Sequence, residues 1–295
     1  MMKGISLASL LLLLPLLANA ETLIRVNALN YPVWIERGTQ VIPLLPGSTL
    51  ASGDMVRTGP SGRAWLSMAD GSVIKLGQSA QFKVVEAGYR QQDDNTVLDA
   101  ALNVIKGAFR FTTAFFKPRR KTPHEVNIKI GTITAGLRGT DIWGRADSEE
   151  DFVTLLEGSI SVESDGDSPV ILSEPLSLYA KKRGQPADPV SLMAQHRVPA
   201  LAAETELSID HGIADENGAY QVVLASLQNP ANSRATLQVL QGKGYAVQSR
   251  SVEKDGQQFT RLFIGGLQSF DAAENLGRQL GEAFDLHDLW INKSR

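Results

Sequence analysis

The six residues Phe259-Thr260-Arg261-Leu262-Phe263-Ile264 end in a strict alternation of aliphatic side chains with aromatic or charged ones. Because side chains in a β-strand alternate between its two faces, Leu262 and Ile264 should face a core, while Arg261 and the two aromatics face the opposite side. The surrounding sequence, from about residue 220 to residue 292, reads strand, helix, strand, strand, helix, strand. We therefore predict a C-terminal α+β domain of the ferredoxin or RNP type (βαββαβ), with a four-stranded antiparallel sheet under two helices.

Turn and capping residues mark the ends of these elements. Pro230 suits the first turn of one helix, and Gly242 should end that helix. Asp255-Gly256 predicts a tight turn into the strand quoted above. Ser269 is suited to cap the second helix, and the last strand is expected from Leu286 to Ile291.

Strand parity also predicts which side chains share the face that the helices leave open. In the last strand, Leu289 and Ile291 should point inward, and in the first strand Val222 and Leu224 should do the same. The open face is then expected to gather Phe259, Arg261, Trp290 and Val223, with Ser226 at its rim. The alternative is that the two aromatics, Phe259 and Trp290, pack against the linker or the preceding domain.

The composition is that of a globular protein with room for two domains. The chain has 295 residues, of which 43% are apolar and 21% charged. A net charge of −3 gives no electrostatic reason to expect nucleic acid as a partner. The sequence has no cysteine, which excludes disulfides, thiolate nucleophiles and cysteine-ligated metals. We expect no cofactor and no metal.

The N-terminus predicts export. Lys3 precedes an apolar run from Ile5 to Leu17, and Ala18-Asn19-Ala20 then has the small-x-small pattern of a cleavage site. Residues 1–20 are therefore predicted to be a cleavable signal peptide, the alternative being an uncleaved anchor. The run is shorter than the roughly 20 residues of a membrane span, and no other segment is suited to cross a bilayer. We expect a periplasmic protein without a membrane span after cleavage.

Residues 21–192 are predicted to form an all-β sandwich or roll. Short alternating segments are separated by turns every 8–12 residues or so, which is typical of such folds. Asp70-Gly71 and Glu157-Gly158 both predict hairpins. Residues 193–218 carry two weak helical patterns and a polar connection, and are expected to link this domain to the C-terminal domain at 219–293.

Four ordered motifs in the β-domain resemble a FecR-type periplasmic domain. They are Gly53-Asp54-Met55-Val56-Arg57-Thr58-Gly59, Ala69-Asp70-Gly71-Ser72, Thr134-Ala135-Gly136-Leu137-Arg138-Gly139-Thr140-Asp141 and Leu156-Glu157-Gly158. Known members relay signals from an outer-membrane receptor to a sigma factor, and they carry a cytoplasmic segment and a membrane helix before this domain. This chain has only the predicted signal peptide there, so the resemblance implies an exported interaction domain rather than that regulator role.

The C-terminal domain resembles a SPOR domain, a module that binds peptidoglycan glycan strands. The resemblance rests on residues 220–227, on the helix end at 240–245 and on residues 261–267. It implies that Ser226, Phe259, Arg261 and Trp290 meet the glycan. The family often has Gln where this chain has Val223, so one polar contact to the sugar is missing. The resemblance assigns no role to Phe263, which we expect near the end of its strand.

These observations favour a non-catalytic protein that binds the denuded glycan strands of peptidoglycan. The alternative is a periplasmic signalling or scaffold protein whose FecR-like domain binds an unidentified protein partner. An enzyme acting on a cell-wall polymer is a minor alternative, because the histidines lack triad or ligand spacing. The histidines are His124, His196, His211 and His287.

Overall fold

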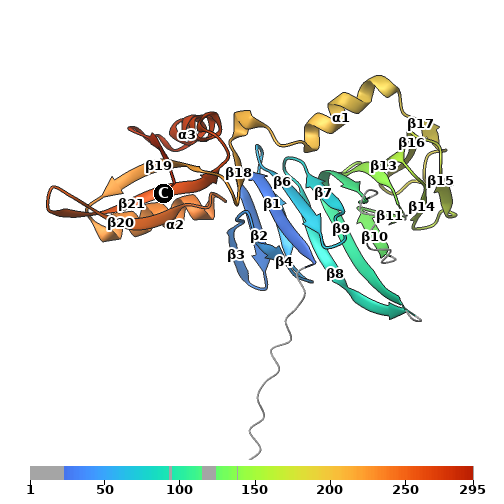
Figure 1. Ribbon diagram of the computed structural model, residues 1–295. Helices are drawn as coiled ribbons and strands as arrows, with labels where there is room; N and C mark the ends of the chain where they lie inside the picture. Colours follow the sequence, from blue (N-terminus) through green and yellow to red (C-terminus); the bar gives the residue numbers. More distant parts are fainter. Residues whose placement is uncertain (1–22, 93–94, 115–123, 138, 295) are drawn as a thin grey trace, which may run out of the picture.

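The computed structural model describes residues 23–92, 95–114, 124–137 and 139–294 (Figure 1). The predicted signal peptide, residues 1–20, and Arg138 of the third FecR-like motif lie outside the described residues.

Two β-sheets form the N-terminal domain (Figure 1). The strands of the first sheet are, in spatial order, β1 (Ile24–Asn30), β6 (Arg63–Met68), β7 (Val73–Leu76), the end of β9 (Asn95–Thr112), β12 (Asp141–Ala146), β13 (Glu150–Glu157), β16 (Ser177–Lys182) and β17 (Ser191–Leu192). The strands of the second sheet are β3 (Gln40–Pro43), β2 (Val33–Arg37), β5 (Met55–Thr58), β8 (Gln81–Gln92), the start of β9, β10 (His124–Ile130), β11 (Ile133–Leu137), β14 (Ile160–Ser164) and β15 (Val170–Leu172). The short β4 (Thr49–Leu50) pairs with the start of β1. Apolar side chains from both sheets share one buried core, which confirms the all-β domain.

Strand β9 belongs to both sheets. Its first part pairs with β8 and β10, and its last six residues pair with β7 and β12. The bend falls at Gly107, whose φ is +90° and where an added Cβ would lie 2.6 Å from Ala80 Cα. Only glycine fits such a left-handed and crowded position without strain, so this residue sets the corner of the sandwich.

One of the two hairpins predicted in this domain is present and the other is not. Asp70-Gly71 joins β6 to β7, which pair with each other. The chain also turns at Glu157-Gly158, but β13 pairs with β12 and β16 while β14 pairs with β11 and β15. The prediction of a second hairpin was wrong because the turn passes the chain from one sheet to the other.

The C-terminal domain has the predicted βαββαβ order. Its elements are β19 (Tyr220–Leu227), α2 (Pro230–Gly242), β20 (Gln248–Lys254), β21 (Gln257–Leu267), α3 (Phe270–Phe284) and β22 (Trp290–Lys293). The sheet order is β22, β19, β21, β20, with every pair antiparallel. Helix side chains such as Leu240 and Leu276 join Leu262 and Ile264 in a buried core, which confirms the predicted α+β fold.

Local chemistry explains the ends of these elements. Asn229 and Ser269 accept backbone hydrogen bonds at the starts of α2 and α3. Asp255 and Gly256 have φ of 53° and 73°, as the two central residues of a type I′ hairpin turn require. The last strand begins at Trp290 rather than Leu286, because the chain makes left-handed turns at residues 285 and 288 before it becomes extended.

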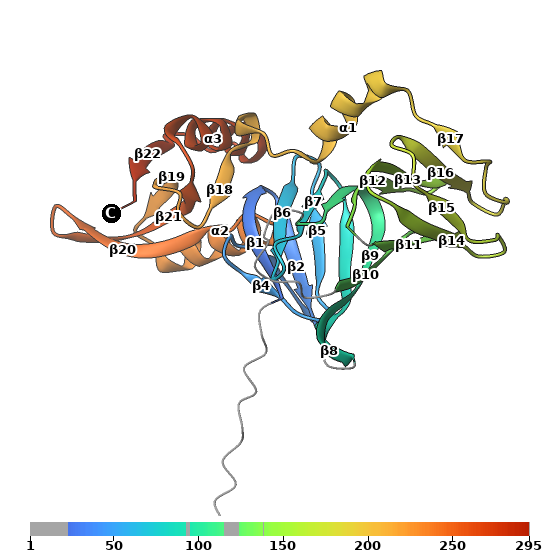
Figure 2. The same ribbon diagram turned by 45° about the vertical axis from the view of Figure 1, so that its right-hand side comes forward.

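Residues 193–218, predicted as the linker, fold against both domains (Figure 2). They contain the 3₁₀ turns η1 (Gln195–Arg197) and η2 (Ile209–His211), helix α1 (Val198–Thr205) and strand β18 (Ile213–Asp215). Strand β18 pairs with β1 on one side, and through Ala214 with Leu267 of β21 on the other. A single short strand thus joins the sheets of the two domains.

Further hydrogen bonds fix the junction. Asn30, fully buried at the end of β1, donates to Ser208 O and accepts from Ser208 N, each at 2.9 Å. The Val33 amide donates to Gly244 O at 3.0 Å, and Trp34 Nε1 donates to Gly242 O at 3.2 Å. The end of helix α2 is therefore bonded directly to strand β2 of the other domain.

Candidate functional site

Strand β21 runs through the middle of the C-terminal sheet and carries the central side chains of the candidate site. Leu262 and Ile264 are fully buried in the core. Phe259, Arg261 and Phe263 alternate with them and are half-buried on the opposite face. The alternation expected from the sequence is therefore present in the strand.

Three of the predicted site residues meet on this face. Arg261 lies in register with Ser226 of β19, and its Nε donates to Ser226 Oγ at 3.4 Å. The guanidinium carbon lies 5.3 Å from the ring centroid of Trp290, which is 36% exposed. Stacking on an aromatic ring holds the planar arginine head in place while its edge stays open to a ligand.

Phe259 lies further along the same strand. It pairs in register with Val252 of β20, two positions from Arg261. The two residues form an apolar strip at one end of the open face, beside the polar centre made by Arg261 and Ser226.

Val223 differs from the expectation that it would point outward as a contact residue. It is fully buried, although its parity places it on the open face. It lies in register with Phe263 on one side and Trp290 on the other, so larger side chains flank it, and the strand is irregular between Val223 and Ala225. Val223 therefore forms part of the floor under the aromatic residues and offers no exposed surface.

Phe263 also lies elsewhere than expected. Strand β21 continues to Leu267, so Phe263 is near the middle of the strand and not at its end. Arg250 of β20 stacks on its ring, with the guanidinium carbon 4.9 Å from the centroid. The open face thus holds two stacked arginine–aromatic pairs, Arg250 on Phe263 and Arg261 on Trp290.

A groove of about 450 Å³ on this face contains residues that the sequence analysis missed. Its lining comes from all four strands of the sheet and consists of Gln221, Arg250, Val252, Arg261, Asn292 and Lys293. Three of these side chains are cations, two are amides and none is a carboxylate. The arrangement favours an anionic or strongly hydrogen-bonding ligand.

The missed residues had a signal in the sequence. The type I′ turn at Asp255-Gly256 fixes the register of the hairpin, and this register places Arg250 directly opposite Arg261. Like charges directly opposite each other destabilise a sheet, so this pair stands out as costly for folding. Side-chain parity within a single strand does not indicate this pair, because it depends on the register between two strands.

Asn292 and Lys293 extend the polar surface along β22. The side-chain oxygen of Asn292, with its amide turned to satisfy its neighbours, accepts from Trp290 Nε1 at 3.1 Å. Lys293 Nζ lies 5.6 Å from the ring centroid of Tyr220. Asn292 and Arg261 together thus orient the Trp290 ring.

Comparison with known protein families agrees with this geometry. The family model of the FecR protein matches residues 54–161, and that of the SPOR domain matches residues 216–285. The chain carries a FecR domain followed by a SPOR domain. A SPOR domain indicates peptidoglycan binding, and a FecR domain indicates periplasmic signalling; together they indicate a cell-envelope protein with non-catalytic binding or regulatory modules.

No curated protein matches the chain. Two crystal structures of a candidate anti-sigma factor from Parabacteroides distasonis ATCC 8503 are similar to it at a TM-score of 0.38, with 10% and 11% sequence identity. The matches cover 70% and 69% of this chain and 97% and 96% of those chains.

The described residues contain neither a membrane helix nor a metal cluster. None of their helices combines the length and the hydropathy that a bilayer span requires. No three of their His, Asp or Glu side chains converge as a metal site would need.

Proposed function

We propose that this protein is an exported, non-catalytic cell-wall protein that binds denuded glycan strands of peptidoglycan. The proposed site is the open face of the SPOR domain, where Ser226, Phe259, Arg261 and Trp290 contact the glycan over a floor that includes Val223. The observation that carries the proposal is the groove with three cations and no carboxylate, bordered by exposed or half-buried aromatic rings.

The chemistry of a denuded glycan suits this surface. Sugar rings present apolar C–H faces that stack on Trp and Phe side chains. Muramic acid carries a free lactyl carboxylate once its stem peptide has been removed, and a guanidinium pairs with a carboxylate through two parallel hydrogen bonds. A strand that still bears its stem peptides lacks the free lactyl carboxylate, and the peptides restrict access to the sugar rings. Removal of the peptide should therefore strengthen binding.

Co-sedimentation with purified sacculi tests the proposal. Protein lacking residues 1–20 should pellet with sacculi, and the pelleted fraction should rise after amidase treatment. Arg261→Ala or Trp290→Ala should lower the apparent affinity about tenfold or more, since a hydrogen bond to a charged group contributes roughly 1.5–3 kcal/mol. Arg234→Ala, an exposed arginine on α2, is the matched control and should pellet like the wild type.

Two outcomes count against the proposal in different ways. If wild type and both site variants pellet equally, the site assignment is wrong. If the wild type does not pellet at all, the ligand is wrong. Export is tested separately: mass spectrometry of protein recovered from the periplasm should show Glu21 as the first residue.

A protein partner for the FecR domain is a second candidate function. The observation that favours it is a row of cations on the outer face of the first sheet, which the chain covers with its own acidic segment. This surface lies on the FecR domain and shares no residue with the groove of the SPOR domain.

A further inference from the structure

The first sheet of the FecR domain carries a row of cations on its outer face. Arg63 lies on β6, Lys75 on β7, Arg110 on β9 and Arg145 on β12, which are four neighbouring strands. Lys75 lies directly opposite Arg110, an arrangement that destabilises a sheet unless anions neutralise it.

Two tryptophans accompany these cations. Lys75 Nζ lies 5.5 Å from the ring centroid of Trp65, and the guanidinium carbon of Arg145 lies 5.7 Å from that of Trp143. The rings hold the cations upright on the sheet. We call Arg63, Lys75, Arg110 and Arg145, with these two rings, the cationic face.

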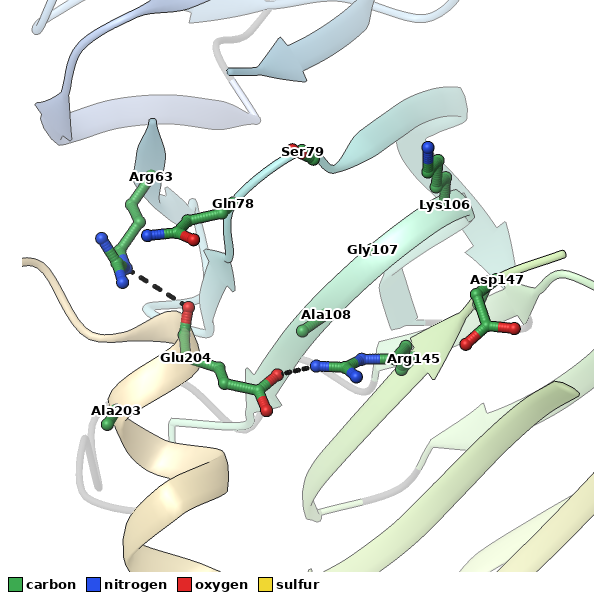
Figure 3. Close-up of a pocket in the computed structure, with 11 residues that line it drawn as sticks. Arg63, Gln78, Ser79, Lys106, Gly107, Ala108, Arg145, Asp147, Ala203 and Glu204 are labelled. Carbon is green, nitrogen blue, oxygen red and sulfur yellow. Dashed lines mark hydrogen bonds and ion pairs between the residues drawn. The ribbon is translucent and has the colours of Figure 1, made fainter. Parts of the chain in front are cut away.

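Most of the neutralising charge comes from one segment at the end of α1. Glu206 accepts from Lys75 Nζ at 2.6 and 2.7 Å and lies 3.8 Å from Arg110, and Glu204 pairs with Arg145 (Figure 3). Arg110 also has a partner within the sheet, Asp141, at 3.0 and 2.6 Å. In the part of the chain that the structure describes, the ion pairs of Lys75 and Arg145 are made with this segment alone.

The face also binds the main chain of this segment. Arg63 Nε donates to the backbone oxygen of Glu204 at 3.3 Å (Figure 3). The same oxygen lies so near Gly77 that an added Cβ there would be 2.8 Å away. A surface that contacts a peptide carbonyl and two carboxylates two residues apart has the chemistry to recognise an acidic peptide of the form Glu-x-Glu.

The segment is held loosely for a helix that covers a charged surface. Helix α1 has eight residues, lacks a side-chain cap at its start and buries only Leu201 and Thr205. Helices of this length have little stability of their own. Glu204 and Arg145 are each more than one third exposed, and ion pairs so exposed contribute little to stability. Local opening of the segment is therefore much easier than unfolding of the sheet beneath it.

Room for further contacts remains beside Glu204. A cavity of about 480 Å³ is lined by Arg63, Lys106 and Arg145, with Asp147 at its edge (Figure 3). Asp147 is engaged by the amides of Glu149 and Glu150 in its own loop. Lys106 has no ion pair among the described residues, and Arg63, only 8% exposed, has no carboxylate within ion-pair distance in that same part of the chain. Burial lowers the pKa of Arg63, and the negative charge of Glu204 only partly opposes this effect.

We propose that the cationic face is a docking surface for an acidic peptide segment of a partner protein, and that residues 198–206 occupy it as an intramolecular substitute. A partner segment with a Glu-x-Glu motif and one further acidic residue would replace Glu204 and Glu206 and reach Lys106. Release of α1 from the face would then alter the connection between the FecR and SPOR domains.

The test measures binding of a synthetic peptide with the sequence of residues 198–207, labelled with a fluorophore, to protein lacking residues 1–20. Wild type should bind it weakly, because its own segment competes. The double variant Glu204→Gln/Glu206→Gln should bind about fivefold to 150-fold more tightly, the range typical of coupled sites. Added NaCl should weaken the binding. The same peptide with both glutamates replaced by glutamine is the ligand control.

Two further variants make the result decisive. Glu163→Gln/Glu174→Gln, which removes two exposed glutamates elsewhere, should leave the wild-type affinity unchanged. Lys75→Ala/Arg145→Ala, made in the Glu204→Gln/Glu206→Gln background, should abolish the gain. Hydrogen exchange of residues 198–205 should be faster in Glu204→Gln/Glu206→Gln than in wild type. This measurement does not require the Lys75→Ala/Arg145→Ala variant, so it tests release of the segment even if that variant fails to fold.

Equal peptide binding by wild type and Glu204→Gln/Glu206→Gln would overturn the proposal. So would unchanged exchange of residues 198–205. A gain of sacculus binding without a gain of peptide binding would also overturn it, since the face would then recognise the glycan. Failure of the SPOR site to bind sacculi leaves these peptide measurements unaffected.

Discussion

Arg250 and Arg261 lie directly opposite each other on strands β20 and β21, each stacked on its own aromatic ring. No carboxylate lines the groove between them among the described residues. Two like charges on paired strands oppose folding, so we expect an anionic ligand to bind across them.

Arg250→Gln should therefore affect binding and stability in opposite directions. Loss of this charge should weaken the binding of amidase-treated sacculi several-fold and reduce the dependence of binding on NaCl, while the free energy of unfolding should be unchanged or rise by about 0.2–1 kcal/mol. Sedimentation at two salt concentrations and urea denaturation measure the two quantities. Parallel losses of stability and binding would show that Arg250 has a structural role instead.

The parts of this site that could be predicted depend on local patterns. The alternation in β21 gave the correct faces for Phe259 and Arg261, and the Asp255-Gly256 turn has the type I′ geometry that its residues favour. Burial of Val223 could not be read from parity, because it depends on the neighbouring Phe263 and Trp290 in two other strands.

Long-range pairing limits prediction still more at the domain junction. Asn30 and Ser208 are 178 residues apart, and no pattern near either residue indicates their contact. The cationic face likewise depends on four strands and on a segment from beyond the domain. Charges on single strands look like solvated surface until the register and the covering segment are known.

Asn30→Ala should loosen the junction. The change leaves the backbone N–H and C=O of Ser208 without their partner, and a buried polar group left unsatisfied costs about 1–3 kcal/mol. Urea denaturation should show this loss, and the Ser208 amide should exchange faster with deuterium. Asn27→Ala on the same strand is the control: it removes one hydrogen bond, from Ser67, at a half-buried site and should cost less. Equal effects of the two changes would argue against a special role for the Asn30 contact.

Gly107→Ala should destabilise the FecR domain by more than about 2 kcal/mol. The left-handed φ costs an alanine about 1–3 kcal/mol, and the added methyl would also overlap Ala80. Gly88→Ala is the matched change in the neighbouring strand, where an added Cβ meets nothing within 4 Å, so its effect should be within about 1 kcal/mol of zero. Thermal and urea denaturation compare the two, and a small effect of Gly107→Ala would show that the β9 corner tolerates a side chain.

Asp167 should contribute a pH-dependent part of the stability. Hydrogen bonds from Lys181 and Ser164 lower the pKa of its carboxyl group to about 2, whereas an unfolded chain titrates near about 3.9. A depressed folded-state pKa means that the contribution is fully present above pH 4 or so and is lost as the pH falls through about 2. The stability difference between wild type and Asp167→Asn should therefore shrink between about pH 4 and pH 2. Asp165→Asn, at an exposed neighbouring site, should show no such trend. Carbon-13 titration of the Asp167 carboxyl measures the pKa directly, and a value near 3.9 would contradict this account of the Lys181 contact.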